Sequence, residues 1–350
     1  MKLKTLKDKI DPAGKNRGGI PAGNQNKQLG AILLALILMI LMQCIVIGIN
    51  EGSAAGIIPK LFASWLNILR NNSYTGIIAL GMCFVIISGG IDLSVGSMTC
   101  ALGALLMYLA DASTGFFSSV GIAGPTAILL SLIFVLFAGA AFGYLNGLLI
   151  SGGKIPPFIV TLGTMKIFRS VTQQLTKNFN PVVPDGLKQI ASFKIGNQVI
   201  LPILYWIILV VIMEVILKKT AFGRRVIAVG SNEKAASYAG IRTGKIKRYV
   251  YVICGVLCAV AAIIYVARIG SMDFANAGSG FEMEAIAAVI VGGTAMSGGR
   301  GDIIGAFLGM MIIGIMNNIL NMLGVPTFLC DAVRGAIIII AVLVQRRQPE

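Results

Sequence analysis

Two glycine-rich breaks between apolar segments carry acidic residues that could do chemistry. The first break spans 88–97 (Ser-Gly-Gly-Ile-Asp-Leu-Ser-Val-Gly-Ser) and contains Asp92. An ionised carboxylate in hydrocarbon is expensive, so Asp92 must face protein, water or a helix end. It is followed by Leu93 and Ser94 and is predicted to cap the next helix by accepting hydrogen bonds from unpaired amides. Alternatively the break exposes backbone groups to a transport path, and the two roles are compatible.

The second break, 297–302, contains Gly299-Arg300-Gly301-Asp302. This matches the Gly-x-Gly-Asp pattern of intramembrane aspartyl proteases, whose chemistry needs two carboxylates that share a proton. The partner in such enzymes resembles Tyr-Asp, whereas Ile91 precedes Asp92 here, and no Pro-Ala-Leu follows. We therefore predict a glycine-rich turn with a capping Asp302 and assign no catalytic residue.

Histidine is absent and the cysteines lack metal-type spacing, which bounds the remaining chemistry. With no His, His-dependent catalysis and His metal ligation are excluded. Cys254 and Cys258 are spaced i,i+4 and are predicted to be small packing residues on one helix face. We therefore expect neither a metal nor a cofactor.

Neutral polar residues inside apolar segments are the candidates for a solute path. The segment 156–176 is unusually polar and includes the i,i+3 pair Lys166 and Arg169, which either line a wet cavity or snorkel outward. Asn side chains could bond a polyol or tie helices together. Asp331 and Arg334 are predicted to pair with one another. The path candidates are Asp92, Ser94, Asn146, Thr161, Thr164 and Asn317.

The composition requires a membrane around these residues. Of 350 residues, 56% are hydrophobic and only 12% charged, about half the charged share of a soluble domain. A bilayer can solvate the apolar outside of a helix bundle, and 43 Gly residues suit close helix approach in lipid. The net charge of +15 lies in tails and loops, so we interpret it as orientation in the membrane and expect no nucleic acid.

The apolar segments predict an all-α membrane bundle of about ten helices with both termini in the cytoplasm. Residues 1–28 form a basic tail that is too long and polar to begin a cleaved signal peptide. Residues 29–344 form one membrane domain, and 345–350 a short tail. Two segments, 73–88 and 284–297, are short enough to be partial helices. The expected spans are 29–49, 73–88, 94–110, 125–151, 156–176, 200–217, 249–267, 284–297, 302–322 and 327–344.

The two breaks resemble one another. Ser88-Gly89-Gly90-Ile91-Asp92 and Ser297-Gly298-Gly299-Arg300-Gly301-Asp302 each follow an apolar segment and lead into a Gly-rich one. This indicates a parallel internal duplication, as in many transporters. The alternative is chance matching in a glycine-rich sequence.

The segment 218–248 is the most informative polar piece, with nine Lys or Arg residues that indicate a cytoplasmic location. Ser231 is a suitable N-cap and Gly240 a natural stop, so we predict a short helix of about 231–239. Such a helix could insert into a groove of a partner protein; the alternative is a basic linker. No G-x-x-x-x-G-K-[ST] pattern occurs, so an ATP-driven motor would be another polypeptide.

Three stretches together resemble a known family: 76–98, 220–241 and 284–305. They look like the permeases of ribose-, xylose- and galactoside-type ABC importers, in the branched-chain amino-acid/sugar permease superfamily. The similarity runs in one order from about residue 60 to 344. The tail 1–28 and the stretch 50–62 look less typical and receive no role.

The resemblance implies an importer subunit that is not itself an enzyme. Its implied partners are an ATP-binding subunit with two nucleotide domains, an extracytoplasmic sugar-binding protein and a second permease, as a homodimer in the bacterial inner membrane. A secondary transporter driven by protons or sodium remains the alternative. The ATPase-coupling residues carried over from the family are Gly230, Asn232, Glu233, Ala235, Ala236 and Gly240.

Overall fold

The computed structural model describes residues 22–51, 57–113, 115–177, 179, 181–195 and 198–346. The basic tail predicted for 1–28 lies outside these residues up to position 21, as do residues 347–350. Each of the ten predicted apolar segments contains a helix. These helices are α1 (Ala22–Glu51), α3 (Ser73–Ile87), α4 (Val95–Ala110), α6 (Gly124–Ser151), α7 (Pro157–Leu175), α9 (Leu201–Lys219), α12 (Thr243–Ile269), α13 (Phe281–Val291), α14 (Ile303–Met322) and α15 (Thr327–Arg346).

Five of the described helices have the length and apolar composition to cross a membrane, namely those within α1, α6, α9, α12 and α14. The two segments expected to be partial helices are indeed short. At 1.5 Å per residue, α3 is about 22 Å long and α13 about 16 Å, against a hydrocarbon core of about 30 Å. The helix predicted over 284–297 ends earlier, at Val291, because Gly292 and Gly293 follow and Gly293 takes a positive φ of 86°.

Further elements connect the ten helices. Within the stretch 50–62, given no role from sequence, 52–56 lie outside the described residues and 57–62 begin an additional helix, α2 (Ile57–Asn71). This helix packs against α1 and α14. The other short elements are α5 (Phe116–Ser119), α8 (Asp185–Ser192), α10 (Ala221–Ser231), α11 (Glu233–Tyr238) and the two-residue antiparallel strands β1 (Lys194–Ile195) and β2 (Gln198–Val199).

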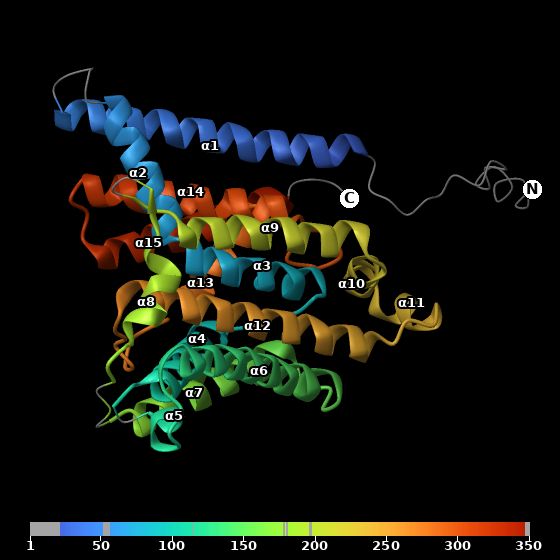
Figure 1. The fold of residues 1–350 in the computed structure, drawn as a ribbon. Helices are drawn as coiled ribbons and strands as arrows, with labels where there is room; N and C mark the ends of the chain where they lie inside the picture. Colours follow the sequence, from blue (N-terminus) through green and yellow to red (C-terminus); the bar gives the residue numbers. More distant parts are fainter. Residues whose placement is uncertain are drawn as a thin grey trace, which may run out of the picture.

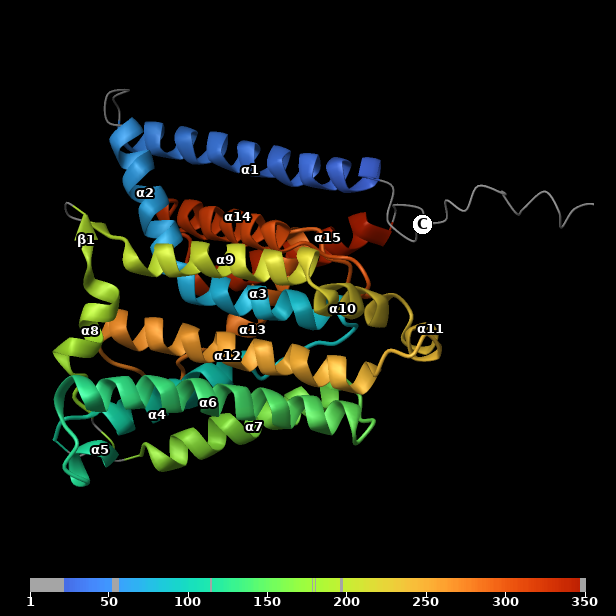
Figure 2. The same cartoon turned by 45° about the vertical axis from the view of Figure 1, so that its right-hand side comes forward.

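The core is built around α12, which packs against α3, α4 and α6. Figures 1 and 2 show α6 and α7 on one side of α12, and α1, α9 and α14 on the other. Small residues permit the tightest contact: a Cβ on Gly143 or Gly255 would overlap the backbone of the facing helix. This is the close helix approach that the glycine content predicts.

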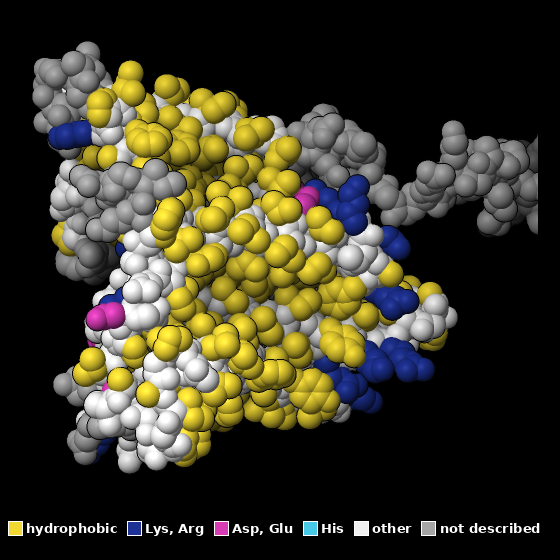
Figure 3. All heavy atoms as spheres, viewed as in Figure 1, with side chains coloured by type: hydrophobic (Ala, Val, Ile, Leu, Met, Phe, Trp, Pro, Cys, Tyr) yellow, Lys and Arg dark blue, Asp and Glu magenta, His cyan; other side chains and the backbone are white. Residues whose placement is uncertain are grey.

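The two ends of the bundle differ in charge. We call the end that carries α10, α11 and the start of α12 the basic end; α1 begins and α15 ends toward it (Figures 1 and 2). Lys and Arg gather there, and hydrophobic side chains cover much of the visible face between the ends (Figure 3). Its exposed cations include Lys219, Arg224, Arg225, Lys234, Arg242 and Lys245. The opposite end carries α5, α8 and the β1–β2 hairpin.

Candidate functional site

A buried polar cluster lies at the first break. Asp92 Oδ1 accepts hydrogen bonds from the Ser94 amide (2.9 Å) and the Ser94 hydroxyl (2.6 Å), and Asn146 Nδ2 donates to Ser94 Oγ (2.9 Å). Tyr251 OH donates to the Ile91 carbonyl oxygen (3.2 Å). Asp92, Ser94 and Asn146 are completely buried. The Asp92 carboxylate therefore accepts from a single amide, just ahead of α4. The predicted capping role implied hydrogen bonds from several amides of the first turn.

The other path candidates lie in different surroundings. Thr161 and Thr164 are buried on α7, and Thr161 Oγ1 bonds the Pro157 carbonyl oxygen (2.9 Å). Asn317 lies on α14 and accepts from Arg334 Nε (3.2 Å). Arg334 also pairs with Asp331 (2.9 Å), as the sequence predicts, and with Glu284 (3.0 Å). Four candidates thus lie around the first break and Thr164 one turn beyond it, whereas Asn317 belongs to an ionic cluster elsewhere.

The second break has a different acidic contact from the one predicted. Asp302 does not cap α14 with its side chain. Its Oδ1 instead pairs with Lys218 Nζ (2.8 Å), and Lys218 also pairs with Glu214 on the same helix. The prediction of a capping Asp302 is therefore wrong: an ammonium group at the end of α9 lies close enough to hold the carboxylate away from the α14 amides.

Both breaks come close to α10 of the 218–248 segment at one point. We call this point the glycine junction, and it consists of Gly89, Gly230, Gly298 and Gly299. The Gly299 amide donates to the Ile87 carbonyl oxygen (2.9 Å). A Cβ on Gly230 would overlap that same oxygen and lie 2.6 Å from the Gly299 nitrogen. A Cβ on Gly298 would lie 3.0 Å from the Gly230 oxygen and 3.1 Å from Gly89 Cα. Only glycine at 230 permits this three-way backbone contact.

The short helix predicted over about 231–239 is present as α11 (Glu233–Tyr238). A further helix that the sequence reasoning did not predict, α10, precedes it, and the chain is extended at Asn232 between the two. Ser231 is the last residue of α10 and does not cap α11; Asn232 does, and its Oδ1 accepts from the Ala235 amide (2.9 Å). Gly240 ends the segment with φ of 81°, as predicted. Among the remaining coupling candidates, Ala236 is buried, whereas Ala235 and Glu233 are exposed.

The α11 helix is held against α12 while its outer side stays open. Glu233 Oε2 pairs with Lys247 Nζ on α12 (2.7 Å). Phe222 of α10 stacks on Phe84 of α3 with ring centroids 6.4 Å apart. The segment thus has fixed contacts with the bundle on one side and exposed residues, including Tyr238, on the other.

A stripe of exposed polar residues follows α7. Lys166, Ser170, Gln173 and Gln174 are exposed, with spacing close to the helical repeat. Arg169, on the same helix, turns toward the chain between α12 and α13: it donates to the carbonyl oxygens of Ala275 (3.2 Å) and Ala277 (2.7 Å). Of the two neighbouring cations predicted from sequence, Arg169 is thus hydrogen-bonded within the protein, whereas Lys166 lies on the surface.

The 270–280 segment between α12 and α13 runs along α4. A Cβ on Gly103 would overlap the Met272 side chain, Cys100 Sγ contacts the Phe274 oxygen, and a Cβ on Gly96 would overlap the Gly278 oxygen. Irregular backbone inside a bundle must be buried in protein or line a wet cavity. This segment does both, since Ala277 and Gly278 are buried, whereas Asp273 and Asn276 are exposed.

The sequence reasoning missed this segment and treated it as a connection. The available signal was composition: Gly, Ser, Asp and Asn recur over 270–280, directly before the shortest predicted span. It also missed Lys218 as the partner of Asp302, since the two residues lie more than 80 positions apart in the chain.

Known proteins similar to this chain share one activity class. The chain is 40% identical to the ribose import permease protein RbsC of Bacillus subtilis, over 81% of this chain and 84% of that protein. It is 34% identical to the D-allose transport system permease protein AlsC of Escherichia coli, over 82% and 86%. It is 31% identical to the galactofuranose transporter permease protein YtfT of the same species, over 90% and 89%. No solved structure matches the chain.

The relatives are permeases, and the described helices include five that can cross a bilayer, so the chain is an integral membrane protein. The family model for the permease component of the branched-chain amino acid transport system matches residues 64–342. This range covers both breaks, α7 and the segment from α10 to α11, and agrees with the resemblance seen over about 60–344. The chain therefore belongs to the permease component family of branched-chain amino acid transport systems, alongside the sugar import permeases.

Proposed function

We propose that this chain is the membrane-spanning subunit of an ATP-driven importer that translocates a neutral monosaccharide, such as a pentose or hexose. The relatives named for ribose, D-allose and galactofuranose support the sugar class. The single observation that carries the mechanism is the glycine junction, where Gly230 touches Ile87, just ahead of the first break, and Gly299 in the second break. A displacement of α10 there is transmitted to α3 and to the chain entering α14 as a rigid-body movement.

The proposed topology has ten membrane-crossing segments between about residues 29 and 344, with the basic end and both termini in the cytoplasm. The cations of the basic end support this orientation. So does the direction of α1 and α15, which begin and end toward that side. The proposed membrane is the bacterial cytoplasmic membrane, since the relatives named as import or transport permeases come from Bacillus subtilis and Escherichia coli.

Three protein partners complete the proposed machine. An ATP-binding subunit with two nucleotide domains docks on the exposed side of α11. The exposed residues Asn232, Glu233 and Ala235 form part of that surface. A sugar-binding protein docks at the opposite end. A second permease copy faces the polar stripe of α7, because Lys166, Ser170 and Gln173 would be costly against lipid. ATP hydrolysis then belongs to the partner, and the permease performs no covalent chemistry.

The solute path follows the polar stripe of α7 and the exposed part of the 270–280 segment. A neutral sugar needs hydrogen-bonding groups and no counter-charge, and Ser170, Gln173 and Asn276 offer them. The buried candidates Asp92, Ser94, Asn146, Thr161 and Thr164 would reach the path only when the first break moves. Asn317 would affect transport indirectly, through the hydrogen bond that it accepts from Arg334.

A secondary transporter driven by protons or sodium is the competing function. Asp92 is its coupling candidate, because one carboxylate oxygen, Oδ2, is buried without a hydrogen-bond partner. Such a transporter leaves the exposed α11 helix without a purpose. Uptake in vesicles that lack ATP would favour it.

The test uses Glu233→Arg in the complex with its ATP-binding subunit and binding protein in proteoliposomes. Charge reversal on α11 disturbs the partner groove, so ATP-driven sugar uptake should fall to background while membrane insertion persists. Lys247→Met is the matched control, because it removes the same Glu233 ion pair without changing the exposed side of α11. Normal uptake by Glu233→Arg, or equal loss in both variants, would remove the coupling role.

A further inference from the structure

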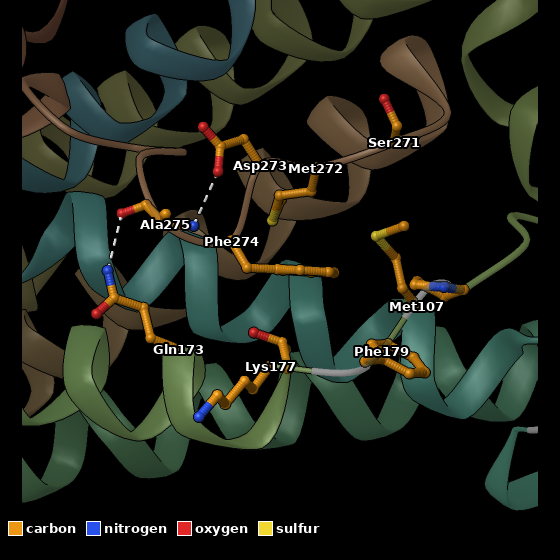
Figure 4. Close-up of a pocket in the computed structure, with 11 residues that line it drawn as sticks. Met107, Gln173, Lys177, Phe179, Ser271, Met272, Asp273, Phe274 and Ala275 are labelled. Atoms are coloured by element: carbon orange, nitrogen blue, oxygen red, sulfur yellow. Dashed lines mark hydrogen bonds between the residues drawn. The ribbon is translucent and has the colours of Figure 1, made fainter.

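A cavity of about 480 Å³ opens at the end of the bundle opposite the basic end. One wall comes from Gln173 at the end of α7 and from Lys177 just after this helix. The other comes from the first half of the 270–280 segment, with Ser271, Asp273 and Phe274. Phe179 closes it on the side of α4 (Figure 4). The volume lies within the range of small-molecule sites, which is roughly 300–1,000 Å³.

The lining combines both charge signs with aromatic surface. Lys177 offers ammonium donors and Asp273 offers carboxylate acceptors. Because the cavity wall carries one positive and one negative group, it favours neither an anionic nor a cationic ligand. The rings of Phe179 and Phe274 have centroids 6.0 Å apart and supply apolar surface. This combination suits a neutral polyhydroxylated ring, whose hydroxyls need donors and acceptors and whose C–H face needs an apolar platform.

The polar groups are held in place before any ligand arrives. Asp273 Oδ1 accepts from the Ala275 amide (3.0 Å) and Oδ2 from Asn276 Nδ2 (2.9 Å). These hydrogen bonds hold the pKa of the exposed Asp273 below its usual value, so the group is an anionic acceptor at neutral pH. Gln173 Nε2 donates to the Ala275 oxygen (3.1 Å), which fixes the Gln173 side chain in the cavity wall (Figure 4).

The cavity also lies at the head of the proposed path. Gln173 belongs both to its wall and to the exposed stripe of α7. One turn farther along α7, Arg169 binds the 270–280 segment at Ala275 and Ala277. A solute in the cavity therefore touches the two elements that continue toward the centre of the bundle.

We propose that this cavity is a receiving site that binds one neutral monosaccharide released at the outer surface, before it enters the path along α7. The proposal rests on the proposed function, since it assumes a sugar substrate and this orientation. It adds a binding site within the permease itself, with Gln173, Lys177 and Asp273 as the polar contacts and Phe179 and Phe274 as the apolar ones.

The test is protection of an introduced thiol in the assembled transporter in lipid nanodiscs. Ser271→Cys places a thiol in the cavity wall, and Ser119→Cys places one on an exposed turn outside it. Labelling by a hydrophilic maleimide is timed with D-ribose, D-allose or D-galactose, and with glycine betaine at equal osmolarity. Each sugar is titrated to roughly 100 mM, well above a millimolar Kd.

We expect at least one sugar to slow labelling of Ser271→Cys saturably, by about ten-fold at ten times its Kd, because only the empty site reacts. Labelling of Ser119→Cys should not change. Adding Gln173→Ala should remove the protection, whereas Gln174→Ala, an exposed neighbour outside the cavity, should keep it. No protection by any of the three sugars, or equal protection at Ser119→Cys, would overturn the receiving site.

ATP-driven uptake by the same purified transporter, reconstituted with binding protein in proteoliposomes, separates the two claims. Uptake without thiol protection rejects the receiving site and leaves the proposed function standing. Protection without ATP-driven uptake of any sugar supports the site and rejects the proposed function.

Discussion

The two glycine-rich breaks share a pattern, Ser-Gly-Gly followed by an Asp, yet the two carboxylates lie in opposite surroundings. Asp92 is completely buried and bonded to Ser94, which Asn146 of α6 also contacts. The Asp302 side chain is 32% exposed and pairs with Lys218 of α9. The first break is therefore anchored inside the bundle by hydrogen bonds from neutral donors to the Asp92 carboxylate, and the second by an ion pair nearer the surface.

This difference separates a fixed contact from an adjustable one. A buried donor that loses its acceptor costs the full desolvation penalty, whereas an exposed ion pair exchanges readily with water. Lys218 also lies one residue before the end of α9, directly ahead of α10. Among the described residues, the second break is thus tied to the 218–248 segment twice, through Lys218 and through Gly230. On the side of the first break, Gly230 contacts Ile87, the last residue of α3.

The largest expected effect is at the point that both breaks share. Gly230→Ala adds a Cβ that overlaps the Ile87 carbonyl oxygen, so the backbone of α10 must move away from both breaks. We expect ATP-driven uptake to fall at least ten-fold, in line with a strain of about 1–3 kcal/mol at the junction. Gly335→Ala is the matched control, because its Cβ meets nothing within 4 Å. Equal uptake by both variants would remove the junction from the mechanism.

The next effect distinguishes the buried carboxylate. Asp92→Leu leaves the Ser94 amide and hydroxyl without their acceptor, which costs about 1–3 kcal/mol of folding free energy. Asp92→Asn keeps an acceptor oxygen and should recover part of that loss. Thermal unfolding in lipid nanodiscs measures both variants. An unchanged melting curve for Asp92→Leu would mean that the first break is not anchored by this cluster.

The smallest effect belongs to the exposed pair. Because Lys218 and Asp302 are partly solvated, Asp302→Asn should cost only about 0.2–1 kcal/mol, and less at high salt. A double-mutant cycle with Lys218→Met isolates the pair energy. Since Lys218 also pairs with Glu214, the Lys218→Met background should be the less stable single variant. A destabilisation by Asp302→Asn as large as that of Asp92→Leu would erase the contrast between the breaks.

Local patterns in the sequence predicted most of the helices. Runs of apolar residues and the breaks at Gly89 and Gly298 locate the ten principal helices, and Gly240 marks the end of α11. The family was likewise visible in three stretches of sequence, and the match over 64–342 confirms it. These features depend on neighbours in the chain, where period and turn chemistry are direct signals.

The contacts on which the proposed coupling rests could not be predicted in this way. Gly230, Ile87 and Gly299 are far apart in sequence and meet only through tertiary packing. For Asp302, local capping by its own helix was the default, and an ammonium group from α9 displaced it. The choice of Asn232 over the adjacent Ser231 as N-cap depends on where α10 ends, which its packing against α3 and α9 determines.

The most direct test of the whole account is sugar accumulation in proteoliposomes with and without the ATP-binding subunit. The account predicts that the complex, supplied with binding protein and ATP, concentrates a monosaccharide, and that the purified chain alone does not. Accumulation against a gradient by the chain alone would contradict it, because nothing would then need to act through the glycine junction.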